Sequence, residues 1–388
     1  MKTLKILIFA LSIPVTLFSQ DFKTVHDGIE YAEVTREISG LKVNINLLRL
    51  DLAKVRIDVV HAMDEAIGVE KTSSIATRHG APAAINAGFF RLDNSLYAGD
   101  PAGVFQIDRR LLSESDRGRI ALFIKNGPTA TDVDIAHYDV RDWFKIGGRE
   151  FELSGTNRER KKDESILYTS GFHRTTLTDR DGLEILVRKG KIAAIFDGQG
   201  STVLPEKGYV ISFSGKARDE VRPLLKVGRK VELFSLLSSS DTGIPITSLK
   251  AAAREEDAER ERLLKAIHSA EDIVGGVARL IKNGKIDITW ELEGAGKSFV
   301  ETRHPRTAVA KLRDGKFLMI TIDGRSESSG GIGLRDLAEY LLSLGAVDAM
   351  NLDGGGSTTM FLDGKVVNHP SDKEGERKVS DALIVRKR

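Results

Sequence analysis

One stretch near the end of the chain restricts the fold most: residues 349–360, with the sequence AMNLDGGGSTTM. Its first half has the composition of a short buried strand, and three consecutive glycines follow. Because glycine lacks a Cβ, its backbone can adopt positive φ and turn N–H groups toward an oxyanion or a closely fitting ligand. The alternative is a glycine bulge with an Asx turn and no ligand. We therefore expect a buried strand that ends in a polar turn.

The composition is that of an ordinary globular protein. Of the 388 residues, 41% are hydrophobic and 29% charged, and the formal net charge is +2. This balance gives no electrostatic argument for a nucleic-acid partner. The chain has no cysteine, which excludes disulfides and a lipidated cysteine anchor, so stability must come from the core.

The N-terminus has the pattern of a secretory signal peptide. Lys2 and Lys5 precede an apolar run over 6–18, which ends in small or polar residues. We predict a signal peptide at 1–20, too short to span a membrane comfortably, and no later run is apolar enough to span. The expected protein is exported, either periplasmic or secreted.

The rest of the chain predicts an α+β or mixed α/β fold, mostly β-rich, with strands flanked by helices. Segments 42–50 and 55–61 have the composition of paired edge strands. We expect an N-terminal β-rich segment at 21–70 and one domain at 71–388. A charged helix at 250–273 is expected to be a solvated insertion.

A C-terminal β-α-β unit places two carboxylates at strand ends. A strand at 317–323 ends in Asp323, a helix with apolar residues at helical spacing follows, and a strand at 347–352 leads to Asp353. If these strands are parallel neighbours, both carboxylates lie at one sheet edge, where open α/β sheets bind ligands.

Two further polar residues allow either a structural or a functional interpretation. Asn86 ends a buried strand and is either a turn former or an amide directed into a cleft lined by Phe89 and Phe90, which would suit sugar recognition. Arg306 is either a surface or salt-bridged arginine, or a guanidinium that holds two phosphate oxygens.

Four motifs occur together in one order: NAGFF at 86–90, HPRTA at 304–308, DGR at 323–325 and NLDGGGST at 351–358. On these motifs the chain, from roughly residue 40 to its end, resembles the phosphodiester glycosidase family, to which the animal uncovering enzyme belongs. GTNR at 155–158, LYT at 167–169 and NHPSD at 368–372 resemble motifs of its bacterial branch, which is linked to exopolysaccharides. Ala87 stands where the family usually has glycine. This difference bears on which substrate is bound more than on the catalytic residues.

The resemblance implies hydrolysis of the bond between a sugar's anomeric carbon and a phosphodiester. Cleavage there builds oxocarbenium character on the sugar, and the departing phosphate monoester needs little acid assistance. A carboxylate acting as base or nucleophile helps, as do a cation and backbone N–H groups that hold the phosphate.

The implied roles fall on eleven residues. Asp353 and Asp323 would be the carboxylates, and His304 an acid or a hydrogen-bond donor to phosphate. The phosphate would be held by Arg306, and by the amides of Gly354, Gly355, Gly356 and Ser357. Substrate contacts are also expected from Asn86, Thr358 and Arg325, the first two to sugar hydroxyls.

Two other hypotheses remain at this point. The chain could be a non-catalytic glycan-binding protein that uses the same cleft, or Asp323 and Asp353 could bind a hard divalent cation such as Ca²⁺. In each case the expected partner is a glycan or sugar phosphate, with no nucleic acid and no membrane span. The sequence leaves the oligomeric state open.

Overall fold

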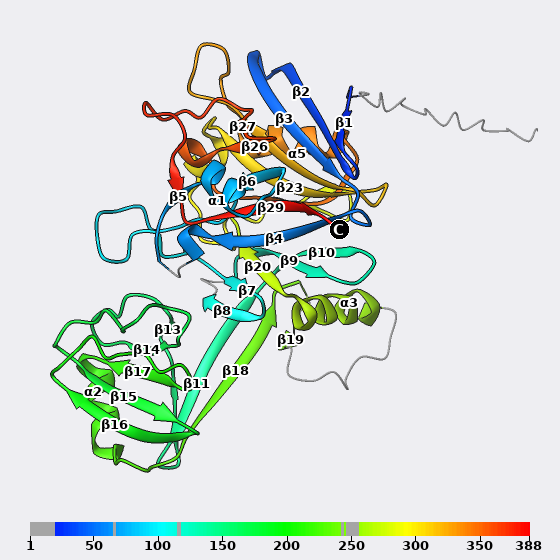
Figure 1. The fold of residues 1–388 in the computed structure, drawn as a ribbon. Coiled ribbons are helices and arrows are strands. Elements are labelled where there is room, and N and C mark those ends of the chain that lie inside the picture. The colour runs from blue at the N-terminus through cyan, green and yellow to red at the C-terminus, as the bar shows by residue number, and fades with distance from the viewer. Residues whose placement is uncertain (1–19, 65–66, 115–117, 242–243, 246–255) are drawn as a thin grey trace, which may run out of the picture.

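The computed structural model describes residues 20–64, 67–114, 118–241, 244–245 and 256–388. The predicted signal peptide, except for its last residue, lies outside this part. No helix in the described ranges is long and apolar enough to cross a membrane. Figure 1 shows a larger body and a second, smaller unit, joined by long strands.

Two sheets face each other in the body. In spatial order, the eight-stranded sheet consists of β1 (Lys23–His26), β2 (Ile29–Ile38), β3 (Leu41–Leu50), β24 (Phe317–Ile322), β23 (Arg306–Leu312), β25 (Ala346–Asn351), β21 (Arg279–Lys282) and β22 (Lys285–Ile286). The five-stranded sheet consists of β27 (Lys365–Val366), β26 (Met360–Leu362), β6 (Ala83–Asn86), β29 (Asp381–Lys387) and β4 (Val55–His61). Apolar side chains of both sheets form one buried core, with Leu48 and Met350 from the first and Ile85 and Leu383 from the second.

Helices cover the outer faces of these two sheets. The spacing that predicts the C-terminal helix is confirmed in α5 (Leu334–Ser343), whose Leu337 and Leu341 are buried against the eight-stranded sheet. On the other side, α1 (Thr72–Arg78) packs Ile75 against the five-stranded sheet. The body is thus layered as helix, sheet, sheet, helix. The remaining short elements of the body are α4 (Lys297–Glu301) and the pair β5 (Glu70–Lys71) and β28 (Lys378–Val379).

The charged helix ends earlier and is less solvated than predicted. Residues 250–255 of the predicted range 250–273 lie outside the described residues, and α3 (Glu256–Ser269) ends before Asp272, where a strand begins. Leu263 and Ile267, four residues apart and therefore on one face, are buried against a further sheet. That sheet consists of β10 (Thr131–His137), β9 (Ile120–Asn126), β20 (Asp272–Gly275), β7 (Phe105–Ile107) and β8 (Arg110–Ser113).

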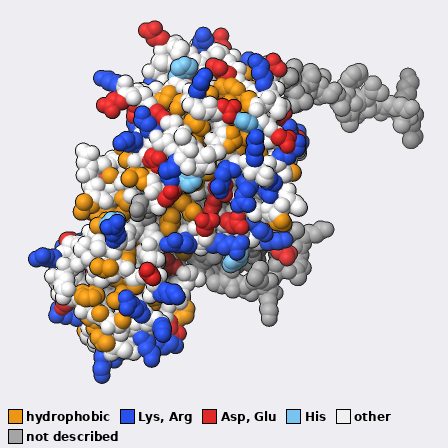
Figure 2. Space-filling model, viewed as in Figure 1, with side chains coloured by type: hydrophobic (Ala, Val, Ile, Leu, Met, Phe, Trp, Pro, Cys, Tyr) orange, Lys and Arg blue, Asp and Glu red, His pale blue; other side chains and the backbone are white. Residues whose placement is uncertain are grey.

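The second unit has its own core and no counterpart in the sequence prediction. Two long antiparallel strands lead to it, β11 (Asp139–Ile146) and β18 (Val231–Ser239), flanked by β12 (Arg149–Glu152) and β19 (Ile244–Pro245). In spatial order, its sheet consists of β13 (Gly155–Thr156), β14 (Ser165–Tyr168), β17 (Tyr209–Phe213), β15 (Leu183–Arg188) and β16 (Lys191–Asp197). The helix α2 (Gly215–Val221) follows β17 in the chain. Phe144, Ile185 and Phe213 are buried in the core of this unit. On the face in Figure 2, basic and acidic side chains are interspersed over both parts.

The expected pairing of the two N-terminal strands is wrong. β3 lies between β2 and β24, whereas β4 pairs with β29 in the other sheet. The connection between them crosses from one layer to the other, so residues 21–70 share both central sheets with the rest of the chain. Strand composition is local and does not reveal such a change of layer.

The C-terminal β-α-β unit is also corrected in one respect. β23 is antiparallel to both β24 and β25 and lies between them. The two strands are therefore parallel but not neighbours. They still end at the same sheet edge, where β23 begins, so three adjacent strands bring Arg306, Asp323 and Asp353 to one edge of the sheet.

Candidate active site

The glycine turn after β25 is packed against two segments that are distant in sequence. The Gly355 N–H donates to the carbonyl oxygen of Pro305 (2.9 Å), and a Cβ at Gly354 would lie only 2.8 Å from the same oxygen. Gly355 has φ +61°, and a Cβ there would lie 3.0 Å from Nη2 of Arg325. Glycine is required at both positions because neighbouring atoms occupy the space of a side chain.

The amides of this turn are mostly used within the protein, contrary to the expectation that they hold phosphate. Besides the Gly355 bond, the Gly354 N–H donates to Oδ1 of Asp353 (2.9 Å) and the Ser357 N–H to the carbonyl of Gly354 (3.1 Å). The turn therefore acts chiefly as a rigid support on which side chains are placed.

Asp353 lies at the start of this turn in an environment that disfavours its charge. Burial raises the pKa of its carboxyl to about 7, against the Ser357 hydroxyl, the Gly354 N–H and Arg377, which lower it. The charge of Asp381 adds to the rise. A carboxyl that titrates near neutral pH is suited to proton transfer, and such groups gather at functional sites.

Asp381 is a buried carboxyl near Asp353 that no pattern in the sequence marks as part of the site. It is fully buried, and one oxygen accepts the Gly88 N–H at 2.5 Å while the other faces the Ser380 hydroxyl. Burial raises its pKa to about 6. Its position at the first residue of a strand carried no functional signal, because only the fold brings it to Gly88 and Asp353.

Replacing Asp381 by asparagine is expected to make stability less dependent on pH. A carboxyl whose pKa rises on folding binds more protons in the folded state, so the contribution of Asp381 to wild-type stability falls as pH rises from about 4 through about 6. Over that range the wild type should lose about 1–3 kcal/mol more unfolding free energy than Asp381→Asn, measured by denaturant unfolding at several pH values. Asp348→Asn, on β25 with a partly exposed side chain, is the control. Parallel curves for wild type and Asp381→Asn would contradict the expectation.

Arg306 has a different task from the one expected. Its side chain is buried, with 2% exposure for the residue, and its Nε and Nη2 donate to three backbone carbonyls, of Phe299 (2.7 Å), Thr302 (3.0 Å) and Ile332 (3.2 Å). Burial and the charge of Arg325 lower its pKa to about 10, so it stays charged at neutral pH. Arg306 thus ties together the loops beneath the turn.

Arg325 and His304 face the turn from the outside. Arg325 is exposed, and its Nη2 lies 3.4 Å from Nδ1 of His304. Burial and the charges of Arg306 and Arg325 lower the pKa of His304, which favours a neutral ring. With Nδ1 facing a guanidinium, the ring proton belongs on Nε2. Arg325 is thus more accessible to an anion than Arg306, and the phosphate contact expected from Arg306 stays a prediction.

Asp323 is enclosed by a motif that the sequence analysis noted but did not include in the site. One oxygen accepts the backbone N–H of His369 (3.0 Å) and the side-chain amide of Asn368 (3.2 Å), and the other lies 3.0 Å from Nδ1 of His369. The same amide of Asn368 also donates to the carbonyl of Thr358 (3.0 Å). Asp323 is thus linked to the strand that follows the glycine turn.

Asn86 and Thr358 lie beside the turn and differ in their hydrogen bonds. The Asn86 amide donates to the carbonyl of Asp353 (2.7 Å), and its oxygen accepts from Thr307 (2.7 Å) and Thr359 (3.0 Å). It therefore positions Asp353, and the bond expected from it to a sugar stays a prediction. The hydroxyl of Thr358 is buried and has no hydrogen-bond partner in the described ranges, so the bond expected from it to a sugar also stays a prediction.

The divalent-cation hypothesis for Asp323 and Asp353 finds no larger acidic cluster in the described residues and stays a prediction. No group of three or more His, Asp or Glu side chains there could hold a metal ion, and the oxygens of Asp323 are engaged by Asn368 and His369. The site is accordingly interpreted through its carboxyls, histidines and arginines.

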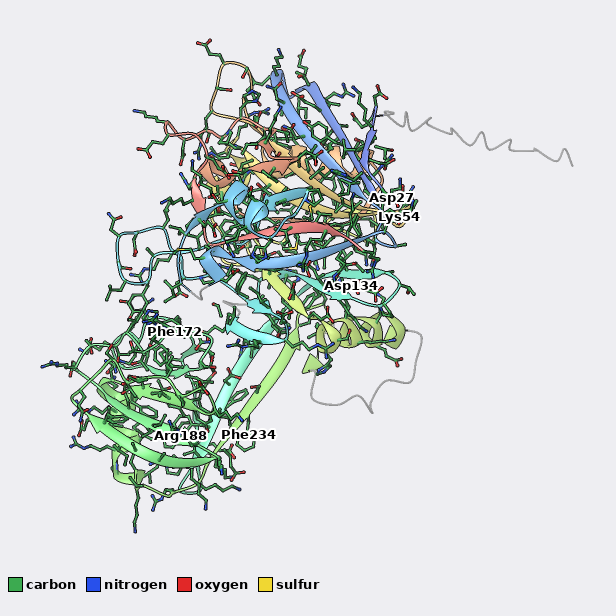
Figure 3. The ribbon with its side chains drawn as sticks, in the orientation of Figure 1. Asp27, Lys54, Asp134, Phe172, Arg188 and Phe234 are labelled. Atoms are coloured by element: carbon green, nitrogen blue, oxygen red, sulfur yellow. The ribbon has the colours of Figure 1, made fainter. Side chains whose placement is uncertain are left out.

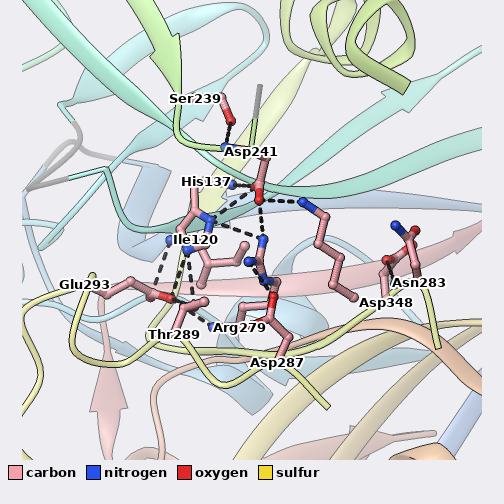
Figure 4. A network of polar contacts seen from close by, with 11 residues as sticks. Ile120, His137, Ser239, Asp241, Arg279, Asn283, Asp287, Thr289, Glu293 and Asp348 are labelled. Carbon is pink, nitrogen blue, oxygen red and sulfur yellow. Dashed lines mark hydrogen bonds and ion pairs between the residues drawn. The ribbon is translucent and has the colours of Figure 1, made fainter. Parts of the chain in front are cut away.

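A buried polar network fixes β21, the strand that pairs with β25. Figure 4 shows His137 between Asp241 and Glu293, with ring-to-carboxylate distances of 3.2 Å on both sides, and Arg279 bonded to Asp241. Lys282 lies 2.8 Å from the same aspartate. Because β11 and β18 leave the body here, the network joins the second unit's connection to the sheet that carries Asp353.

A cavity of about 700 Å³ lies away from the glycine turn. It is lined by His61 and Arg110 of the body and by Phe172 and Arg174 of the second unit, and Figure 3 shows Phe172 at the end of that unit nearest the body. None of the residues expected at the site lines this cavity. It belongs to the contact between the two parts of the molecule.

Comparison with known proteins gives a family-level match. A family model described as phosphodiester glycosidase matches residues 181–386, more than half of the chain. The bovine protein N-acetylglucosamine-1-phosphodiester alpha-N-acetylglucosaminidase is 31% identical over 182 residues, which cover 45% of this chain and 33% of the bovine protein. The chain thus matches about a third of that relative's length.

Two solved structures share the fold. A hypothetical protein from Synechocystis has a TM-score of 0.77 and 22% identity, and covers 95% of this chain and 64% of its own. A candidate exported protein from Burkholderia pseudomallei has a TM-score of 0.72 and 22% identity, and covers 90% of this chain and 75% of its own. At this identity the likeness shows the fold alone.

Proposed function

The chain belongs to the phosphodiester glycosidase family, and from that premise we propose that it hydrolyses the bond between a sugar's anomeric carbon and a phosphodiester. One observation carries the proposal: Asp353, with its raised pKa, shares the edge of one sheet with Arg325, His304 and Asp323. These are the group types that such a cleavage needs.

In the proposed reaction Asp353 acts in its ionised form on the anomeric carbon, as base for the attacking water or as nucleophile. Arg325 would hold the phosphate, and the neutral His304 would donate to a phosphate oxygen through Nε2. The hydroxyl of Thr358 would bind the sugar once its side chain turned outward, because the oxygen is buried in the structure. The name of the bovine relative makes N-acetylglucosamine the first sugar to test.

We further propose that the protein is exported and acts on a phosphoglycan or exopolysaccharide. The apolar run at 6–18 behind two lysines supports export, and one structural neighbour is described as a candidate exported protein. The motifs at 155–158, 167–169 and 368–372, which resemble those of the family's bacterial branch, support this substrate class.

A release assay tests the proposed function. The protein is incubated with a simple alkyl diester of N-acetylglucosamine 1-phosphate and with diesters of other sugar 1-phosphates. The expected result is equimolar free sugar and alkyl phosphate from at least one substrate. Saturable binding of these compounds without any product would instead support the non-catalytic glycan-binding alternative.

A further inference from the structure

The pair of Asp323 and His369 combines a buried carboxylate with an exposed ring. Asp323 is 2% exposed, whereas the side chain of His369 is 75% exposed. The carboxylate binds the histidine twice, through the backbone N–H to one oxygen and through Nδ1 to the other, both at 3.0 Å. This double attachment turns Nδ1 inward and leaves Nε2 pointing toward solvent.

This geometry differs from that of an ordinary surface ion pair. His26 and Asp363 also form a histidine–aspartate pair, at 2.6 Å, but the aspartate is 51% exposed and can be hydrated instead. Such pairs contribute little and hold no fixed orientation. Asp323 is withdrawn from water, so its bonds to His369 and Asn368 fix the ring.

The pair also stands at the rim of the proposed site. Asn368 connects Asp323 to the carbonyl of Thr358, directly after the glycine turn. On the other side, Asp323 is two residues before Arg325, whose guanidinium lies against Gly355. His369 is therefore held beside the place proposed for the phosphate.

We propose that His369 is a catalytic proton donor to the departing phosphate and that Asp323 is its positioning residue; this rests on the proposed function. The bond from the anomeric carbon to the bridging oxygen breaks, and its electron pair stays on that oxygen, which takes the Nε2 proton. A bond from water to the anomeric carbon forms, and Asp353 takes the water's proton. Asp353 then releases its proton to solvent, and His369 takes one from solvent. A weak acid suffices because the phosphate monoester is a good leaving group, and the carboxylate behind the ring stabilises the imidazolium.

Steady-state kinetics test this role. His369→Gln should lower kcat about 100-fold on the substrate found in the release assay. Asp323→Asn should lower kcat with little change in KM. His26→Gln is the matched control and should behave as wild type. An unchanged kcat in His369→Gln would overturn the proposal.

A second measurement does not depend on turnover. In ¹⁵N-histidine spectra, the neutral ring of His369 should be the Nδ1–H tautomer in the wild type and should change to Nε2–H in Asp323→Asn. If no phosphodiester is cleaved but the tautomer is as expected, the proposed function has failed and the pair stands. Turnover with an Nε2–H tautomer in the wild type would refute the pair.

Discussion

Asp353→Asn is expected to lower kcat about 10³-fold and to leave the fold intact. The variant lacks the carboxylate that is proposed to act on the anomeric carbon as base or nucleophile. Asparagine has nearly the same shape and can still accept the Gly354 N–H that Asp353 accepts at 2.9 Å. The pKa of about 7 also fixes the sign of the pH dependence: wild-type kcat/KM should rise with pH through about 7 as the carboxyl ionises.

The control for this variant is Asp348→Asn on the same strand. The carboxylate of Asp348 accepts the Asn283 N–H at 3.1 Å and lies away from the strand's glycine end. Its replacement should leave kcat within about twofold of wild type, in keeping with the small effects of most surface substitutions. Equal turnover by Asp353→Asn and Asp348→Asn would remove Asp353 from the mechanism.

Replacing Arg306 or Arg325 by methionine is expected to affect different properties, stability in the first case and substrate binding in the second. Arg306→Met leaves three backbone carbonyls without this donor, one of them buried, so the unfolding free energy should fall by about 1–3 kcal/mol. Arg325→Met removes an exposed side chain, so stability should change by less than about 0.5 kcal/mol. In that variant KM should instead rise about 10- to 100-fold, because a charge-assisted contact to phosphate is lost.

Denaturant unfolding and steady-state kinetics on both variants distinguish the two arginines. If Arg306→Met folds as stably as wild type but loses substrate binding, the phosphate contact belongs to Arg306, as the sequence predicts. If Arg325→Met keeps the wild-type KM, Arg325 does not hold the phosphate.

Local patterns in the sequence predict the strand ends of the site well. The apolar runs before Asp323 and Asp353 are strands, and the helix between them has the predicted apolar face. These patterns do not predict the order of strands in the sheet. β23 lies between β24 and β25, and the apolar pattern of those two strands gives no sign that a third strand separates them. The second unit was missed for a similar reason, because its strands have the same composition as those of the body.

The partners of the candidate side chains were least predictable. In the sequence Asp323 resembles a free catalytic carboxyl. In the structure a loop near the C-terminus covers it, and the exposed side chain there is that of His369. Arg306 looks like a phosphate ligand, but carbonyls of neighbouring loops take up its donors. Both outcomes depend on contacts between distant segments, which motif spacing does not encode.

The central claim is that the chain breaks the bond on the sugar side of the phosphate, and hydrolysis in H₂¹⁸O tests it most directly. Mass spectrometry of the released phosphate monoester should show no ¹⁸O, because water attacks the anomeric carbon and the bridging oxygen leaves with phosphorus. Incorporation of ¹⁸O into the phosphate would show attack at phosphorus and would contradict the account.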